Sequence, residues 1–382
     1  MRDVLRWCEF IEGKSKHFSN VRQEDSFRHE STLMNEGAFL FFISRLRTAQ
    51  DRKYARDLFE DIFGFPMVVN FDPPLFIQNN YAIVGLESIF LSPLGFRKEN
   101  FRISSILGGL RKPLESVSCC VNQNWPTLLV GHDGRGKRTC VRHLAAIAGS
   151  KLVEFAASSS TDSTELLGSF EQSNVMRYLY RGLDHCGELL RLLGTNIVSS
   201  VLDTISQYSY SAACGLYSEI CSLADRIELH DSMKLGDGDK LFSLIQSFLA
   251  QQWEISDLLQ ANSITGADLI VENLNAAKTL LQKCHQLANG SNHSGFEWVD
   301  GVVVEALRYG HWLLISNVNL CSASVLDRLN SILEPGGTLL LTENGEGETI
   351  AAHSNFRIFF TMVRNFLFLL IFIFLCVQCT HL

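Results

Sequence analysis

The sequence has no excess of positive charge. Its 33 lysine and arginine residues are outnumbered by 41 aspartate and glutamate residues, giving a formal net charge of -8 over 382 residues. Broad electrostatic binding of nucleic acid needs a basic surface, so we expect no direct sequence-specific binding of nucleic acid. With 46% hydrophobic and 19% charged residues, the composition is ordinary for a globular chain of two or three domains.

Long apolar segments are also lacking. Between Met1 and Lys16 charged side chains are mixed with apolar ones, so the hydrophobic region of a secretory signal is missing and we expect an intracellular protein. Residues 366–377 form a run of twelve apolar residues, shorter than the roughly 20 that cross a bilayer as a helix. We interpret residues 363–382 as an aberrant apolar tail from a mispredicted or read-through coding segment, and a membrane anchor is the less favoured alternative.

The cysteines form neither a disulfide framework nor a metal-site pattern. Their number, 11, is odd and they are scattered along the chain, which indicates reduced thiols. Cys376 and Cys379 make one C-x-x-C, without a second pair or a histidine cluster at zinc-finger spacing. We therefore expect no metal site from these residues, and expect most of the cysteines to be small core residues.

Hydrophobic periodicity divides the chain. Residues 31–64 repeat apolar positions at helical spacing, and Gly64 ends the pattern. Prolines interrupt residues 65–100, which indicates a linker or a few short strands. From about residue 101 the pattern is that of an α/β domain, and residues 173–294 are interpreted as a helical insert.

Within the α/β region, a helix is predicted over residues 139–148. Short apolar runs predict buried strands at 128–130, 152–155, 312–315 and 357–362. Strands that alternate with helices predict a mostly parallel sheet that binds its ligand at the carboxyl ends of the strands.

A glycine-rich turn follows the first of these strands and precedes the predicted helix. Residues 131–137, GHDGRGK, match the spacing of a phosphate loop. Backbone N–H groups in such a turn converge on phosphate oxygens, the helix adds the positive end of its dipole, and the lysine reaches the β- and γ-phosphates. A surface turn is the alternative. The candidate nucleotide-binding residues are Gly131, His132, Asp133, Gly134, Arg135, Gly136, Lys137, Arg138 and Thr139.

The residue after the lysine departs from the phosphate-loop pattern. A serine or threonine hydroxyl that binds Mg²⁺ is expected there, and the chain has Arg138. Mg²⁺ needs oxygen ligands, whereas a guanidinium only donates hydrogen bonds. Thr139 lies about 100° further round the helix, so its hydroxyl is expected to point away. Mg²⁺ is therefore doubtful, and Arg138 is a candidate to place its own charge near the phosphates.

An ATPase also needs an acidic pair at the end of a hydrophobic strand, to support the metal and orient the attacking water. The candidate strand, residues 311–315, ends in Ser316 and Asn317, neither of which carries a charge. A plain core strand explains the stretch equally well. The catalytic residues are therefore unknown.

Two further segments have structural interpretations. Ser324 to Asp327 fits a capping box that opens a helix, with an apolar face that we expect in the core. That face consists of Val325, Leu326, Leu329, Ile332 and Leu333. Ser158 to Asp162 is interpreted as a strand-to-helix loop with an N-cap in preference to a cluster of phosphorylation sites.

Residues 119–172 and 295–362 closely resemble the midasin family of dynein-related AAA ATPases. The sequences that carry the resemblance are LVEFAASSSTDSTELLGSFEQ, FEWVDGVVVEALRYGHWLLISNVNLCSASVLDRLNSILEPGG and HSNFRIFFTM. SRLRTAQDRKYARDLFEDIFG, at residues 44–64, is similar to the helical lid that closes the preceding module of that family.

The resemblance implies a fragment: residues 1–64 as the lid-like segment of one AAA module, 65–100 as a linker, and 101–362 as the P-loop NTPase core of the next. It assigns residues 131–137 to the phosphate loop and the strand ending at Ser316 to the acidic-motif strand. The family usually has threonine at the position of Arg138 and aspartate at that of Ser316. A polar residue that senses the γ-phosphate is replaced as the tail begins at residues 363–365, so ATP hydrolysis is expected to be impaired.

The resemblance also implies partners and a location. ATP would be the nucleotide, and the partners would be adjacent AAA modules and the pre-60S ribosomal particle with its assembly factors. The role would be large-subunit assembly and nuclear export, in the nucleolus and nucleoplasm of the nucleus. The alternative is a non-enzymatic truncated fragment with a structural role.

Overall fold

The computed structural model describes the chain in segments. They are residues 2–15, 23–46, 48–69, 72–78, 81–90, 108–172, 175–199, 275–283, 296–334, 336–345, 347–363 and 378–381, with a few single residues between 214 and 247. These segments form two units, Met1–Ser169 with Val299–Leu382, and Phe170–Trp298. Among the described helices none is long and apolar enough to cross a membrane, and the apolar run 366–377 lies outside the described residues.

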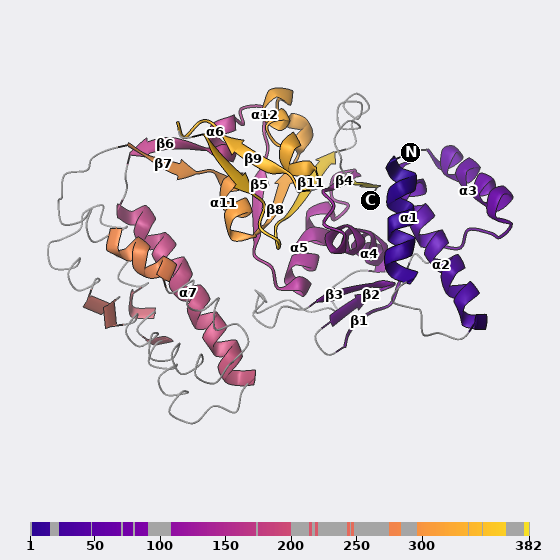
Figure 1. The fold of residues 1–382 in the computed structure, drawn as a ribbon, viewed down its shortest axis with the longest axis horizontal. Coiled ribbons are helices and arrows are strands. Elements are labelled where there is room, and N and C mark those ends of the chain that lie inside the picture. The colour runs from indigo at the N-terminus through magenta and orange to yellow at the C-terminus, as the bar shows by residue number, and fades with distance from the viewer. Residues whose placement is uncertain are drawn as a thin grey trace. The chain divides into compact units, whose positions relative to one another are not determined.

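A five-stranded parallel sheet forms the centre of the first unit (Figure 1). Its order is β12 (Gln378–His381), β4 (Thr127–Gly131), β11 (Arg357–Val363), β8 (Trp312–Ser316) and β5 (Leu152–Ala156). Four of these strands lie where the sequence predicts them. The fifth, β12, comes from the segment that we interpreted as an aberrant tail. Every residue of β4 and β8 is buried, as expected for parallel strands covered on both faces.

Helices α4 (Gly108–Asn122), α5 (Lys137–Ala148) and α11 (Val302–Tyr309) pack against the sheet. Leu114 and Val117 of α4 share one core cluster with Leu129 of β4 and Leu144 of α5. The sequence pattern predicts α5 but not α4. The first turns of α4 contain Gly108, Gly109 and Pro113, residues that usually mark a turn or a break in a sequence, although the helix is buried continuously from Leu114 to Val121.

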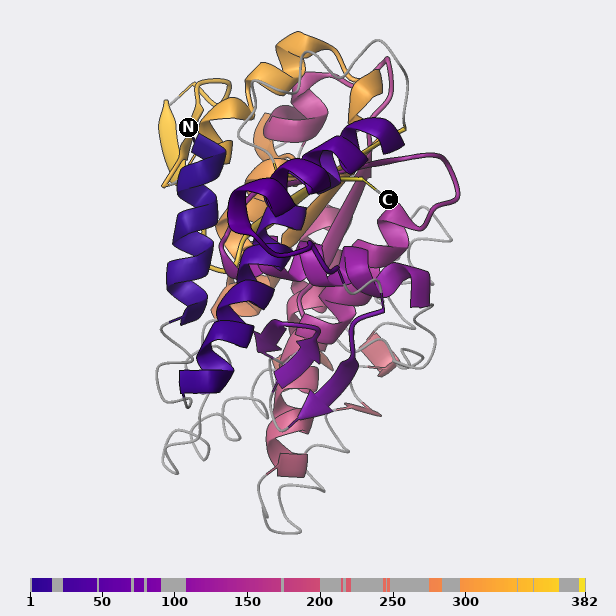
Figure 2. The same ribbon diagram turned by 90° about the vertical axis from the view of Figure 1, so that its right-hand side faces the viewer.

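The lid-like segment consists of α1 (Arg2–Ser15), α2 (Gln23–Phe41), the 3-10 turn η2 (Ile43–Arg45) and α3 (Ala49–Phe63). Figure 2 shows α1 and α2 running side by side. Gly64 adopts φ 74° and donates its N–H to Glu60 O at 2.8 Å, which is the left-handed helix end that glycine favours. The predicted end of the helical pattern at Gly64 is thereby confirmed.

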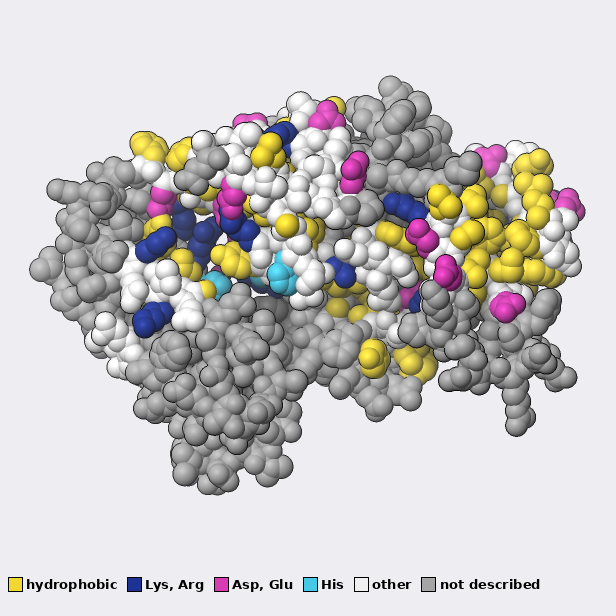
Figure 3. All heavy atoms as spheres, viewed as in Figure 1, with side chains coloured by type: hydrophobic (Ala, Val, Ile, Leu, Met, Phe, Trp, Pro, Cys, Tyr) yellow, Lys and Arg dark blue, Asp and Glu magenta, His cyan; other side chains and the backbone are white. Residues whose placement is uncertain are grey.

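Helix α3 leaves an apolar stripe exposed, and apolar side chains gather over this region in Figure 3. Tyr54, Leu58 and Ile62 are 71%, 46% and 65% exposed. They lie four residues apart and therefore share one face of the helix. Only Phe59 is buried among the residues of α3, so most of its apolar surface is left outside the core.

Residues 65–100 contain the short strands that the sequence indicated. β1 (Leu75–Gln78), β2 (Tyr81–Val84) and β3 (Glu87–Phe90) form an antiparallel sheet. Ala82, Val84 and Ile89 are buried in the same core cluster as α4 and α5. The segment therefore packs onto the core.

Shorter elements complete the first unit. They are α6 (Ser163–Leu167), η4 (Val318–Leu320), α12 (Ala323–Asp327), η5 (Asn330–Leu333), β9 (Thr338–Leu341) and β10 (Glu348–Ala351). Asp162 caps α6 by accepting from Ser163 N, which confirms the predicted strand-to-helix loop.

The capping box that we predicted at Ser324 is wrong. The N-cap of α12 is Ser322, and its side chain makes no capping hydrogen bond within the described residues. The helix ends after one turn, at Asp327, and the chain then forms the 3-10 turn η5. The predicted apolar face is nonetheless buried at all five positions.

In the second unit, α7 (Val175–Ser199) and residues 275–283 are helical, and most of the rest of the predicted insert, residues 173–294, lies outside the described residues. The strands β6 (Gly168–Gln172) and β7 (Phe296–Asp300) pair where the insert leaves and rejoins the core sequence. Arg177 of α7 bonds Glu171 at 2.5 Å and Glu297 at 3.4 Å. These ion pairs tie the first turn of α7 to both strands.

The burial of β4 predicts a large effect of truncating one of its side chains. Leu129 is 0% exposed, whereas Leu340 of β9 is 50% exposed. We expect Leu129→Ala to lower the free energy of unfolding by roughly 2–5 kcal/mol, through lost burial and a residual cavity. The matched change Leu340→Ala should stay within about 0.5 kcal/mol. Urea denaturation followed by circular dichroism measures both, and equal effects would contradict the burial assigned to β4.

Candidate nucleotide-binding site

The glycine-rich bend lies where the sequence predicts it. Gly131 is the last residue of β4 and Lys137 the first of α5. Gly134 and Gly136 adopt φ 75° and 80°, in the left-handed region that glycine enters at little cost. Gly136 is the N-cap of α5, and its carbonyl accepts the first helical hydrogen bond, from Cys140 N at 2.8 Å. The chain therefore turns directly from a buried parallel strand into a helix N-terminus.

Leu110, near the start of α4, packs against this bend. A Cβ atom added to Gly136 would lie 3.0 Å from Leu110 Cδ2, whereas one added to Gly134 would meet no described atom within 4 Å. Gly136 is therefore required for both its backbone conformation and its close contact. Sequence reasoning missed Leu110, because Gly108, Gly109 and Pro113 around it indicate a turn and obscure the helix that carries it.

The side chain of Lys137 lies across the bend. Its Nζ donates to the carbonyl oxygens of Gly131 and His132, at 2.8 Å each. The residue is only 7% exposed. Burial lowers the pKa of the Lys137 ammonium, the Asp133 carboxylate opposes that shift, and the nearby Arg138 guanidinium adds to it. A polyanion that accepted hydrogen bonds from this ammonium would compensate for the lost hydration.

The other candidate residues line the outer side of the bend. His132, Asp133, Arg135 and Arg138 are exposed, and Thr139 is half-buried. The exposure of His132 and Asp133 is consistent with a role in shaping the loop. The bend is thus open to solvent and has one buried cation, Lys137, at its base.

The candidate acidic-motif strand ends at the same edge of the sheet. β11 lies between β4 and β8, and it pairs Val363 with Gly131 and Phe360 with Ile315. Ser316 ends β8 and is 2% exposed, and its carbonyl accepts from Ala157 N at 2.9 Å. The structure therefore brings the bend, Ser316 and the end of β11 to one edge, as the parallel topology predicts.

Asn317, the second residue at the acidic-motif position, begins the turn after β8. It adopts φ 56°, in the left-handed region, and is the N-cap of η4. Asparagine tolerates this conformation better than most residues. The neutral amide suits a turn, but it offers no charge with which to activate water.

A magnesium ion does not fit the residues present at this edge. Arg138 supplies only donors, Ser316 is a buried neutral hydroxyl, and Asn317 is a neutral amide, whereas Mg²⁺ is usually held by carboxylates and hydroxyl or phosphate oxygens. Among the described residues no group of three or more histidine, cysteine, aspartate or glutamate side chains could hold a metal ion.

The parallel sheet and its flanking helices fit an AAA domain, which is a P-loop NTPase. Residues 273–366 match the AAA domain of the dynein-related subfamily. This range contains β8 and β11 and begins after the phosphate loop. Residues 1–66 match the midasin AAA lid domain. The fold predicted from the sequence is therefore confirmed.

The whole chain is similar to midasin. It is 29% identical to midasin of Dictyostelium discoideum over 404 aligned residues, which cover 95% of this chain and 6% of the relative. It is 27% identical to midasin of Giardia intestinalis over 403 aligned residues, which cover 94% of this chain and 8% of the relative. The resemblance predicted from the sequence is confirmed, and the chain spans less than a tenth of the length of these relatives.

The two glycines of the bend give distinct predictions. Gly134→Ala should destabilise the protein by roughly 1–2 kcal/mol, the cost of a left-handed conformation with a Cβ atom. Gly136→Ala should cost more, because its Cβ atom also crowds Leu110. The double change Leu110→Ala with Gly136→Ala should bring the destabilisation, measured against Leu110→Ala alone, down to the Gly134→Ala level. Chemical denaturation compares the variants, and equal costs for the two single changes would rule out the Leu110 contact.

Proposed function

We propose that this chain binds ATP at residues 131–139. The observation that carries the proposal is the buried Lys137 ammonium, held at the base of a bend whose two left-handed glycines lie between β4 and α5. Backbone amides in such a bend, one ammonium group and the positive end of a helix dipole together suit the phosphates of a nucleotide. Similarity to an AAA domain supports the same ligand.

We further propose that hydrolysis by this chain is impaired. Phosphoryl transfer depends almost entirely on positioned charges around the metal and the attacking water. Arg138 and Ser316 stand where the family usually has a threonine and an aspartate, and the apolar Val363 ends β11 beside Gly131. Three supporting positions are thus altered at one edge of the sheet, which leaves nucleotide binding without an evident means of turnover.

In its cellular role the chain is proposed to act as one module of a midasin-like ATPase. The similarity over 95% of the chain supports this placement, and the lid-like segment at residues 1–66 followed by a core indicates parts of two adjacent modules. The proposed partners are the pre-60S ribosomal particle and its assembly factors, and the proposed location is the nucleus. Large-subunit assembly and nuclear export would be the process served.

A structural role without nucleotide is the second candidate function. The loss of charge at Ser316 and the guanidinium at Arg138 favour it, because both changes remove metal support. Nucleotide binding distinguishes the two candidates directly, since a purely structural fragment has no need of the Lys137 ammonium.

Titration with a fluorescent ATP analogue tests the site. We expect saturable binding, weakened about tenfold or more by Lys137→Ala, because that change removes a charge-assisted contact to phosphate. Lys53→Ala, at an exposed position in α3, is the control and should bind like the unaltered chain. Equal binding by the unaltered chain and Lys137→Ala would refute the proposed site.

Magnesium dependence and turnover test the altered positions. Affinity in excess EDTA should stay within about threefold of that in Mg²⁺, because Arg138 offers the ion no oxygen ligand. Arg138→Thr should make binding stronger in Mg²⁺ than in EDTA. Steady-state phosphate release by the unaltered chain should equal that of Lys137→Ala. Turnover of several per second would show that these residues do support hydrolysis.

A further inference from the structure

A buried network of charged side chains connects the lid-like helices to α4. Lys112 of α4 bonds Glu36 of α2, and it bonds Glu115 of its own helix at 2.8 Å. The side chains of Lys112, Glu36 and Glu115 are only 7%, 13% and 9% exposed. Phe39, one turn after Glu36 on α2, places its ring centroid 5.4 Å from Lys112 Nζ. Helix α2 therefore holds this ammonium with a carboxylate and an aromatic face.

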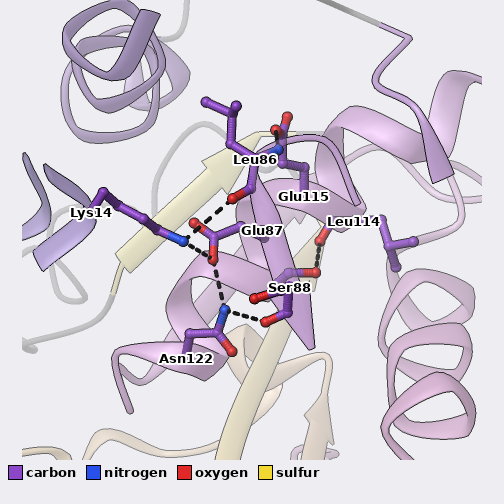
Figure 4. A network of polar contacts seen from close by, with 8 residues as sticks. Lys14, Leu86, Glu87, Ser88, Leu114, Glu115 and Asn122 are labelled. Atoms are coloured by element: carbon purple, nitrogen blue, oxygen red, sulfur yellow. Dashed lines mark hydrogen bonds and ion pairs between the residues drawn. The ribbon is translucent and has the colours of Figure 1, made fainter. Parts of the chain in front are cut away.

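The same network includes the small antiparallel sheet (Figure 4). Glu115 accepts from the backbone N–H of Leu86, in the turn between β2 and β3, at 2.8 Å. The next residue, Glu87, accepts from Lys14 of α1 at 2.8 Å and from Asn122, the last residue of α4, at 2.7 Å. Helix α2 and the small sheet are thus bonded to α4 directly, and α1 is connected to it through Glu87.

Helix α4 carries this network to the phosphate loop. Leu110 lies two residues before Lys112, and its side chain packs on Gly136. A shift of the first turns of α4 would therefore move the support of the residue that precedes Lys137. Gly136 is the N-cap of α5, so a displacement of Leu110 would change the packing against the residue at which the phosphate loop ends.

Stability alone is a weak reason for such a network. A buried ion pair is often no more stabilising than apolar side chains of the same volume, whereas the loss of one partner leaves a charge buried without compensation. The network therefore favours one arrangement of α2 against α4 and penalises others.

We propose that the Glu36–Lys112–Glu115 network couples the affinity of the phosphate loop for nucleotide to the docking of the lid-like helices on α4, with Leu110 as the positioning residue. The proposal rests on the nucleotide binding proposed above and adds the regulation of that site. Thermodynamic linkage makes the coupling reciprocal: docking of α2 strengthens nucleotide binding, and nucleotide strengthens the docking of α2 by the same factor.

The affinity of the full chain for the fluorescent ATP analogue tests the coupling. Glu36→Gln removes one charge and leaves Lys112 paired with Glu115, so we expect this variant to keep its fold. Lys112→Met would instead leave two buried carboxylates without their cation and could unfold the protein. We expect Glu36→Gln to weaken binding by roughly three- to tenfold, within the range of such coupling effects. The matched control is Glu343→Gln, which breaks the exposed pair with Arg328 and should leave affinity unchanged.

A double-mutant cycle and hydrogen exchange separate coupling from simple destabilisation. Leu110→Ala should weaken binding by a similar factor, and adding Glu36→Gln to it should have little further effect, because both changes interrupt the same connection. In the unaltered chain, nucleotide should slow amide exchange in α2. In Leu110→Ala that protection of α2 should be lost, even at saturating nucleotide.

The outcomes separate this proposal from the one on which it rests. If the unaltered chain binds nucleotide in a Lys137-dependent manner but Glu36→Gln binds with unchanged affinity, the network is structural and the coupling is refuted. Additive effects of Leu110→Ala and Glu36→Gln would also refute it. If Lys137→Ala binds as well as the unaltered chain, the nucleotide site itself is wrong and the coupling falls with it.

Discussion

The site depends on a backbone constraint: the chain must leave a fully buried strand and enter a helix within five residues, 132–136. Two left-handed glycines make that reversal possible, and a Cβ atom at Gly136 would crowd the side chain of Leu110. The bend places Lys137 where its ammonium is buried and bonded to the carbonyls of the same loop. Binding of a nucleotide would replace those carbonyls with phosphate oxygens. The carbonyl hydrogen bonds therefore hold the Lys137 ammonium at the base of the bend before any phosphate is bound.

The features predicted correctly from the sequence depend on local rules. Buried strands such as β8 appear as unbroken apolar runs, and the phosphate loop has a fixed spacing of glycines before Lys137. The end of the lid-like segment at Gly64 follows from the preference of glycine for a left-handed helix end. Parallel topology then gathers the ends of β4, β8 and β11 at one edge, so the residues expected around the nucleotide could be named before the fold was described.

What the sequence did not predict depends on packing between distant segments. Helix α4 begins with Gly108 and Gly109 and contains Pro113, which indicate a turn in the sequence, and its charged residues Lys112 and Glu115 are buried where exposed positions would be expected. The contact of Leu110 with Gly136, and the bonds from Lys112 to Glu36, join parts of the chain that no local rule relates. The predicted capping box at Ser324 failed because the chain already enters α12 at Ala323, with Ser322 as the N-cap, so that Ser324 lies inside the helix.

The position of β12 has a consequence for association between molecules. Gln378–His381 pairs along β4 on the side away from β11. Without these four residues the outer edge of β4 would present unsatisfied N–H and C=O groups along an apolar strand, which is a template for adding a strand from another molecule. The pairing of β12 therefore covers an edge of the sheet that would otherwise be open to an added strand.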